Sequence, residues 1–406
     1  MSSNRKPFPP HSDVPPENVH GFKTIQQAWT LPASVTDFSQ QQVHDLIKFL
    51  IKAITEIRDT TGDFLLHMDD GRVIDTKSWN SGWEWTHGIG LYGIYNFWTM
   101  TGDKQAYDVM IDWFEPRLKQ GTPSKNINTV SPFLTLANLY EADSQGRRAW
   151  KSYIESWSDF LMRRLPRTEE GGFQHIVYNS VNEGQLWDDT LMMSVLPLAK
   201  FGLLLNRPDY VEEAKRQTLL HIKYLVDNKT GLWVHGWEFI NRTTFAGALW
   251  ARGNCWITMF IPEFIDLLKL QPGDALREHL VATLVAQIKA LERYQDPNNG
   301  MWHTLLDDPT SYVESSATAG FCFGILLSLR LAIIPQEYIE RFTAVAMKAL
   351  AATVSQIDDE GQLQNTSFGT AIGHTLEHYR TVYITPMPYG TSLAICAIGE
   401  FLRTYL

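Results

Sequence analysis

The chain contains few cysteines for its length, with only Cys255, Cys322 and Cys396 among 406 residues, each within an apolar run. Three scattered thiols cannot form a disulfide framework, so we expect a reducing compartment, the cytoplasm. Basic clusters are also missing, since 35 Lys and Arg residues stand against 45 Asp and Glu residues, a formal charge of −10. This balance argues against nucleic acid or an anionic membrane as the main partner.

Other common signals are absent as well. The sequence has no uncharged apolar stretch of about 18 residues, the length that a membrane-spanning helix needs. Residues 1–18 are polar and proline-rich, without the apolar segment of a secretory signal. No Cys, His or Asp group has the spacing of a metal site, and no glycine-rich phosphate loop or nucleophile elbow occurs. We therefore expect neither a required metal nor a cofactor.

Helical periodicity, by contrast, runs through most of the chain. Between Val43 and Ile57 apolar residues recur three or four positions apart, the pattern of an amphipathic helix. Six stretches of this kind are predicted near 39–59, 103–119, 146–164, 208–227, 275–294 and 335–354. Six others, apolar nearly all round and rich in small residues, alternate with them near 85–100, 131–141, 186–205, 248–269, 313–332 and 389–405. A helix that is apolar on every face is buried.

The connections between these helices also alternate. Short turns with Gly or Pro lead from each apolar helix to the next amphipathic one, and long loops lead back. The repeat of roughly 50–60 residues is typical of repeat architectures. We predict an all-α fold, an (α/α)6 toroid of six helical hairpins with inner helices buried and outer helices amphipathic. An open α-solenoid would need a polar face on the inner helices. Residues 1–20 are expected to form a flexible tail and 21–406 a single domain.

In such a toroid every long loop lies at one end, where every inner helix begins. Six helix N-termini then supply partial positive charge and free N–H groups to one mouth, which favours a small anionic ligand. The chain is also rich in tryptophan, with 14 residues. Indole rings pack in cores, but they also suit stacking against a sugar face.

The sharpest local signal is the acidic pair Asp188 and Asp189 at the start of the third inner helix. Neighbouring residues on a helix point about 100° apart, so the two cannot serve one pocket equally. One carboxyl is expected to cap the helix. The other, beside Trp187 and two methionines, would be partly desolvated and able to keep a proton near neutral pH, as a general acid must.

Two further candidates lie in the fourth repeat. Arg252 and Trp256 are four residues apart and share one helix face, with Trp250 next to them. Such a guanidinium is suited to binding a sugar carboxylate, although a cation–π packing contact is the plainer alternative. His235 is either a proton carrier or hydroxyl contact, or a packed structural histidine. His303, His374 and His378 are weaker candidates.

Five segments in order resemble glycoside hydrolase family 105, the unsaturated rhamnogalacturonyl hydrolases, and more distantly family 88, the unsaturated glucuronyl hydrolases. They are Trp83-Glu-Trp-Thr-His-Gly-Ile-Gly-Leu-Tyr-Gly93, Lys125-Asn-Ile-Asn-Thr129, Trp187-Asp-Asp-Thr-Leu-Met-Met193, Trp250-Ala-Arg-Gly-Asn-Cys-Trp256 and Glu314-Ser-Ser-Ala-Thr318. The resemblance implies Asp189 as the catalytic acid and base. It implies a substrate-binding set of Trp85, His87, Asn126, Trp187, His235, Trp250, Arg252 and Trp256. Many relatives carry an aspartate in the second long loop, where this chain has Asn126 and Asn128.

The implied partner is a small oligosaccharide with an unsaturated uronyl end, most closely an unsaturated galacturonyl group on a rhamnogalacturonan fragment, as in pectin degradation. The implied reaction is acid-catalysed hydration of the C4=C5 vinyl ether. Three alternatives stay open from the sequence. They are an unsaturated glucuronyl hydrolase acting on other lyase products, a sugar 2-epimerase on the same toroid, and a carbohydrate-binding helical scaffold without enzymatic activity.

Overall fold

The computed structural model describes residues 39–68 and 71–406, so the tail expected at 1–20 lies outside the described residues. Within them, amphipathic outer helices occur in each of the six predicted regions. Their bounds are α2 (Gln40–Glu56), α4 (Lys104–Gln120), α7 with η3 (Trp150–Asp159, Phe160–Arg164), α9 (Pro208–Leu225), α11 (Ala275–Tyr294) and η5 with α13 (Gln336–Tyr338, Ile339–Ser355). Helix α2 buries the predicted stripe and is capped by Ser39, which forms a capping box with Gln42.

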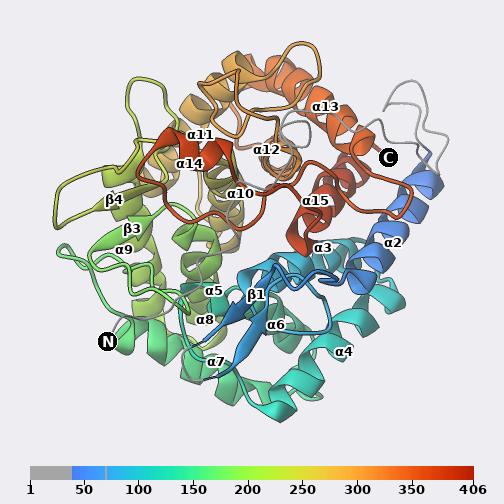
Figure 1. Ribbon diagram of the computed structural model, residues 1–406, viewed down its shortest axis with the longest axis vertical. Coiled ribbons are helices and arrows are strands. Elements are labelled where there is room, and N and C mark those ends of the chain that lie inside the picture. The colour runs from blue at the N-terminus through green and yellow to red at the C-terminus, as the bar shows by residue number, and fades with distance from the viewer. Residues whose placement is uncertain (1–38, 69–70) are drawn as a thin grey trace.

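The buried inner helices are confirmed too. They are α3 (Trp85–Thr101), α5 with α6 (Ile127–Val130, Pro132–Ala142), η4 with α8 (Leu191–Val195, Leu196–Leu204), α10 (Ala251–Leu267), α12 (Ser315–Arg330) and α15 (Pro388–Tyr405). Each inner helix contacts the next, and α15 contacts α3, so the ring closes (Figure 1). The predicted (α/α)6 toroid is therefore confirmed, and the alternative of an open solenoid is excluded.

Small residues allow the inner helices to approach closely. A Cβ built on Gly93 of α3 would lie 2.7 Å from the carbonyl oxygen of Ser392 in α15. A Cβ built on Gly324 of α12 would lie 2.4 Å from the carbonyl oxygen of Thr258 in α10. Backbone packs directly against backbone at both places, so these contacts set the width of the ring.

A recurring turn starts many of the long loops. After α2, α9, α11 and α13, an aspartate accepts backbone hydrogen bonds from the residues that follow it, and a glycine with positive φ comes three or four positions later. The pairs are Asp59 with Gly62, Asp227 with Gly231, Asp296 with Gly300 and Asp358 with Gly361. Such turns need a residue that tolerates φ above zero. The repeat thus extends from the helices into the loops.

Two short antiparallel pairs of strands decorate the loops. Strands β1 (Leu65–His67) and β2 (Val73–Asp75) form one pair, and β3 (Gln185–Trp187) and β4 (Gly236–Glu238) form the other. The chain also folds back on itself around Gly231, where Val226 and Trp233 form an antiparallel bridge, whereas β4, which follows His235, pairs with β3 of the third loop. This pairing joins two repeats at the mouth of the toroid.

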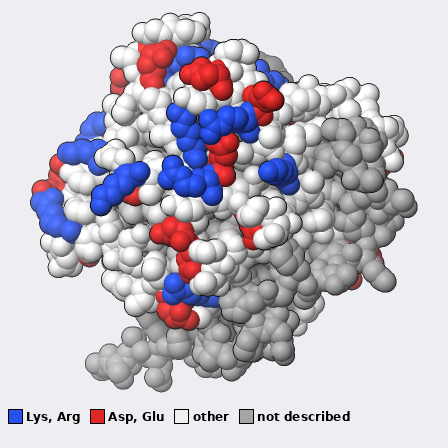
Figure 2. All heavy atoms as spheres, turned by 90° about the horizontal axis from the view of Figure 1, so that it is seen from above, with Lys and Arg blue, Asp and Glu red and all other residues white. Residues whose placement is uncertain are grey.

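The sequence lacks clusters of basic residues, and the distribution of charge on the surface agrees with this. Figure 2 shows a face on which acidic and basic side chains are interspersed rather than separated into fields of one sign. Among residues 39–68 and 71–406, no helix combines the length and apolar character required to cross a membrane.

The close approach of α12 to α10 gives a first prediction. Gly324→Ala should lower the free energy of unfolding by about 1–3 kcal/mol, because the new methyl group meets backbone that cannot move aside. Gly399→Ala in α15 is the matched control, since its Cβ would meet nothing nearer than Met100 at 3.7 Å and alanine favours the helix. Urea unfolding of both variants tests this expectation. Equal stability of the two variants would contradict it.

Candidate active site

Strands β3 and β4 bring the third and fourth long loops together. Trp187 pairs with Gly236, and the Asp188 N–H donates a hydrogen bond of 3.0 Å to the His235 carbonyl oxygen. The chain then turns into η4, a π-helical first turn of the third inner helix. Irregular turns of this kind are frequent at functional sites. The acidic pair and His235 are therefore neighbours although 46 residues separate Asp189 from His235.

The two carboxyl groups of the pair have different environments. Asp188 is fully buried, and neither of its oxygens has a hydrogen-bond partner among the described residues, so it does not supply the helix cap expected from one member of the pair. Asp189 keeps 15% of its side chain exposed, with Oδ1 buried 3.4 Å from Nδ1 of His175. Burial raises the pKa of Asp188 well above its usual value, and the nearby charge of Asp189 adds to the shift. Burial also raises the pKa of Asp189, to about 7, against the opposing charge of Arg252.

Asp189 is thus the member of the pair that solvent or a substrate can reach, and it keeps its proton to near neutral pH. A carboxyl group with this pKa and this exposure can act as a general acid and, once ionised, as a general base.

Aromatic rings line up beside this carboxyl. His175 stacks flat on Trp187, with ring centroids 4.2 Å apart and an angle of 2° between the planes. Trp187 meets His235 edge-on at 5.4 Å, and His235 lies 4.3 Å from Trp250. Burial lowers the pKa of His175 to about 3, so this ring is neutral beside Asp189 and does not pair with it as a cation.

Arg252 has contacts that the sequence did not predict. It is fully buried: Nη1 donates to the Ser367 carbonyl at 3.0 Å, and Nη2 donates to the Phe368 carbonyl at 2.8 Å. Nη1 also lies 3.5 Å from Glu314, which accepts a hydrogen bond from the Ser367 N–H. Both terminal nitrogens are therefore used inside the protein, and Nε alone lacks a partner. The geometry favours an anchor for the sixth loop over a two-pronged clamp on a sugar carboxylate.

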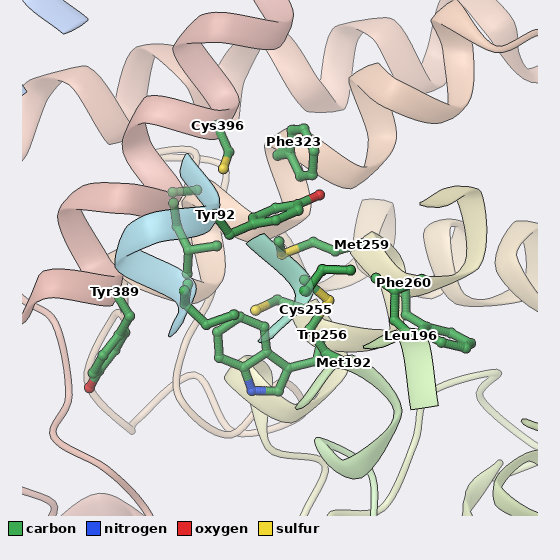
Figure 3. Close-up of a cluster of buried hydrophobic side chains, with 14 of the residues drawn as sticks. Tyr92, Met192, Leu196, Cys255, Trp256, Met259, Phe260, Phe323, Tyr389 and Cys396 are labelled. Carbon is green, nitrogen blue, oxygen red and sulfur yellow. The ribbon is translucent and has the colours of Figure 1, made fainter. Parts of the chain in front are cut away.

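Two tryptophans of the predicted set lie deeper. Trp256 is 1% exposed and belongs to the buried cluster that contains Met192 and Cys255 (Figure 3). The half-buried Trp85 meets the ring of Trp256 edge-on at 6.0 Å and packs on Tyr389 at 4.5 Å. The buried Trp256 therefore packs against the more accessible Trp85 and helps to fix the position of its ring.

The remaining two predicted residues have local partners. Both ring nitrogens of His87 are engaged inside the protein, Nε2 with the Ser78 carbonyl at 3.0 Å and Nδ1 with Thr86, and the residue is fully buried. No contact joins it to the acidic pair among the described residues. Asn126 caps α5 by accepting the Thr129 N–H at 3.0 Å, which leaves its buried Nδ2 without a partner. Asn126 keeps a free donor, whereas His87 keeps none.

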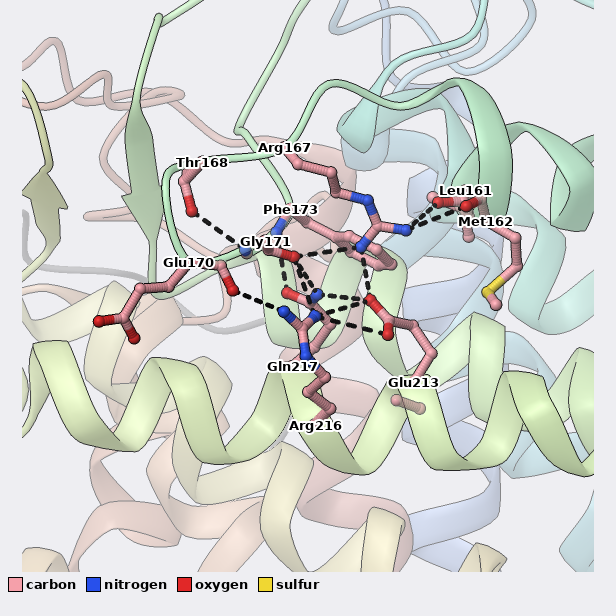
Figure 4. Close-up of polar contacts among 12 residues, drawn as sticks. Leu161, Met162, Arg167, Thr168, Glu170, Gly171, Phe173, Glu213, Arg216 and Gln217 are labelled. Atoms are coloured by element: carbon pink, nitrogen blue, oxygen red, sulfur yellow. Dashed lines mark hydrogen bonds and ion pairs between the residues drawn. The ribbon is translucent and has the colours of Figure 1, made fainter.

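Sequence reasoning missed His175, Tyr379 and Glu84. Tyr379 lies 2.8 Å from Nδ1 of His235, and Glu84 is a buried carboxyl that caps α3 and whose pKa burial raises to about 8. The third loop that carries His175 is tied to α9, where Gln217 accepts the Phe173 N–H and donates to the Gly171 carbonyl (Figure 4). For His175 and Tyr379 the available signal was weak, because each is a single polar residue in a long loop without a motif around it. Glu84, in contrast, lies inside the Trp83–Gly93 segment and was not singled out there.

No group of three or more His, Cys, Asp or Glu side chains suited to a metal ion occurs within residues 39–68 and 71–406. The candidate site thus consists of one accessible carboxyl, two neutral histidines and indole rings.

The contacts of Arg252 give a second prediction. Arg252→Met should lower the free energy of unfolding by about 3–5 kcal/mol, because Glu314 would stay buried without its partner. It should also make residues 366–385 more sensitive to limited proteolysis. Arg163→Met, which removes an exposed ion pair with Asp159, should change stability by less than about 0.5 kcal/mol. Unchanged stability of Arg252→Met with a raised KM would instead support the clamp.

Both the sequence and the fold of the chain are similar to those of known glycoside hydrolases. The sequence profile of glycosyl hydrolase family 88 matches residues 56–405. A crystal structure from Salmonella enterica serovar Paratyphi A, titled a possible member of the GH105 family, is 48% identical, with a TM-score of 0.88 over 93% of this chain and 97% of that one. A similarly titled structure from Klebsiella pneumoniae is 48% identical, with a TM-score of 0.87 over 94% and 100%.

A curated relative agrees. The unsaturated rhamnogalacturonyl hydrolase YesR of Bacillus subtilis (strain 168) is 30% identical over 326 residues, which cover 79% of this chain and 90% of the relative. The match to the family profile spans nearly all of the described toroid, the candidate site included. The chain therefore belongs to the glycosyl hydrolase family 88 and 105 group, and it is a glycosidase.

Proposed function

We propose that this glycosidase removes a 4,5-unsaturated uronyl residue from an oligosaccharide by hydrating its C4=C5 double bond. The observation that carries the proposal is the state of Asp189, an accessible carboxyl whose pKa burial raises to about 7. Family membership removes the sugar 2-epimerase and the non-enzymatic scaffold from the alternatives.

The reaction needs a single carboxyl group. Asp189 donates its proton to C4 of the vinyl ether, which leaves an oxocarbenium-like cation at C5. The Asp189 carboxylate then takes a proton from water as the water oxygen bonds to C5. The resulting hemiketal opens and releases the remaining sugar. An ordinary glycosidase needs two carboxyl groups flanking the anomeric carbon. Here one group acts first as acid and then as base.

Arg252 assists this cycle through its charge. It lowers the pKa of Asp189 against the effect of burial, and so favours the carboxylate that forms after proton transfer. Because its terminal nitrogens hold the sixth loop, we assign the sugar carboxylate to other donors. Among the described residues, Nε2 of His235 and Nδ2 of Asn126 are both buried without a partner. Of the three indoles, the half-buried Trp85 is the one we assign to stacking on the sugar, since Trp187 and Trp250 are buried against His175 and His235.

For the substrate, we propose an unsaturated galacturonyl group linked to rhamnose, following the name of the Bacillus subtilis relative. An unsaturated 3S-rhamnoglycuronyl hydrolase from Alteromonas sp. (strain LOR) is more distant, at 23% identity over 44% of this chain. We place the reaction in the cytoplasm, since Cys255, Cys322 and Cys396 are buried free thiols.

Asp189→Asn should lower kcat roughly 10³-fold or more, because the amide cannot supply the proton. Asp188→Asn is the matched control: its carboxyl is fully buried and out of reach of a substrate, so the amide should affect mainly stability. The assay follows the ultraviolet absorbance of the conjugated double bond in an unsaturated galacturonyl-rhamnose disaccharide. Loss of activity in Asp188→Asn alone would show that the wrong carboxyl was chosen. If the natural protein turns over none of several unsaturated disaccharides, the proposed function itself is refuted.

The pH dependence has a definite sign. The reactive form of Asp189 is the protonated one, and its pKa is raised to about 7, so kcat/KM should fall as pH rises through that value. The fall of kcat/KM with rising pH should follow the ionisation of a single group. A rate that holds constant to pH values well above 7, or that falls only below about pH 4, would show that Asp189 is not the proton donor.

A further inference from the structure

Tyr379 reaches the candidate site from the far end of the chain. It belongs to α14 (Leu376–Arg380), a short helix in the sixth long loop, and is 1% exposed. Its hydroxyl lies 2.8 Å from Nδ1 of His235, and the same hydroxyl oxygen accepts the Gly373 N–H at 3.1 Å. A contact across 144 residues therefore joins the sixth loop to the fourth.

These two hydrogen bonds decide which nitrogen of His235 carries its proton. Burial holds the pKa of His235 well below its usual value, so the ring is neutral and has one N–H. The Gly373 N–H already donates to the tyrosine oxygen, which leaves the tyrosine proton to find an acceptor. Nδ1 of His235 is the acceptor within reach. If Nδ1 carried the proton instead, the tyrosine hydrogen would be buried without a partner, which is unfavourable.

The other ring nitrogen then becomes the donor. Nε2 of His235 is buried and has no hydrogen-bond partner among residues 39–68 and 71–406. The ring is held between Trp187, edge-on at 5.4 Å, and Trp250 at 4.3 Å, so it has little freedom to rotate. An N–H held rigidly beside two indoles and left unpaired is suited to an oxygen acceptor on a bound molecule.

We propose that Tyr379 is a positioning residue that locks His235 in the Nε2–H tautomer, so that His235 donates a hydrogen bond to an oxygen of the unsaturated sugar. The sugar contact rests on the proposed function; the tautomer does not. Tyr379 itself touches no substrate and acts through His235.

The surrounding loop supports this role. The Gly373 carbonyl accepts the Ala246 N–H at 3.3 Å, and His374 meets Phe245 edge-on at 5.3 Å. Phe245 has a φ of 59°, which is unusual for a bulky residue. The fourth and sixth loops are thus joined next to the Gly373 N–H that donates to the Tyr379 hydroxyl, and the backbone of Phe245 is strained where they meet.

The tautomer can be measured without any substrate. Long-range ¹H–¹⁵N NMR of protein labelled with ¹⁵N-histidine distinguishes the two neutral tautomers, and the His235 signals are those that vanish in His235→Gln. We expect the Nε2–H form in the natural protein and a mixture, or the Nδ1–H form, in Tyr379→Phe. An Nδ1–H form in the natural protein overturns the proposal, whether or not Tyr379→Phe folds.

Kinetics then test the consequence for the substrate. Tyr379→Phe should lower kcat/KM roughly tenfold, mainly through KM, the effect of one weakened hydrogen bond. Glutamine can place an amide N–H near the position of Nε2 without help from Tyr379. The same tyrosine change should therefore cost less than about twofold in a His235→Gln background. An equal loss in both backgrounds overturns the proposal, because it shows a merely structural role.

Tyr383→Phe is the matched control in the same loop. The ring of Tyr383 is half-buried and contacts Phe64, and within residues 39–68 and 71–406 its hydroxyl forms no hydrogen bond. It should leave both the tautomer and kcat/KM unchanged. A tautomer shift in Tyr383→Phe as large as that in Tyr379→Phe would also overturn the proposal. If the natural protein turns over no unsaturated disaccharide, the proposed function fails while the tautomer measurement still stands.

Discussion

Two neighbouring carboxyl groups, Asp188 and Asp189, are held away from water at the start of the third inner helix, and the rest of the site is arranged around that desolvation. A charged carboxylate is costly to bury, so burial keeps a proton on both groups to higher pH than in water. The two carboxyl groups differ in their accessibility to solvent. Asp188 is sealed, whereas Asp189 retains a partly exposed side chain. The acidity of Asp189 is thus set mainly by packing, with the charge of Arg252 opposing part of the rise in pKa.

The toroid provides this environment because its inner helices begin at one mouth and pack backbone against backbone below it. Long loops cover this mouth, and defined hydrogen bonds and ion pairs attach the loops to one another and to the inner helices. The β3–β4 pair joins the third loop to the fourth, and Arg252 with Glu314 holds the sixth loop through Ser367 and Phe368. Removing either attachment would admit water to the acidic pair and lower the pKa of Asp189 towards its usual value. Stability and acidity are therefore linked through the same loops.

The fold could be predicted from the sequence because its signals are local and repeated. The stripe from Val43 to Ile57 and the uniformly apolar run from Gly88 onward each report burial directly. The position of Asp189 followed from its motif and from its place at an inner-helix start. Contacts between distant loops could not be predicted, since nothing near Tyr379 in the sequence indicates His235 as its partner. The anchoring role of Arg252 was hidden for the same reason, because two of its acceptors are backbone carbonyls more than a hundred residues away.

The central claim is that burial keeps Asp189 protonated to near neutral pH. The most direct test is a ¹³C NMR titration of the carboxyl groups in protein labelled with ¹³C-aspartate, with the Asp189 signal identified by its loss in Asp189→Asn. The account predicts a midpoint close to pH 7 for Asp189 and a pKa for Asp188 raised above its usual value. A midpoint for Asp189 near the ordinary value of about 4 would contradict it.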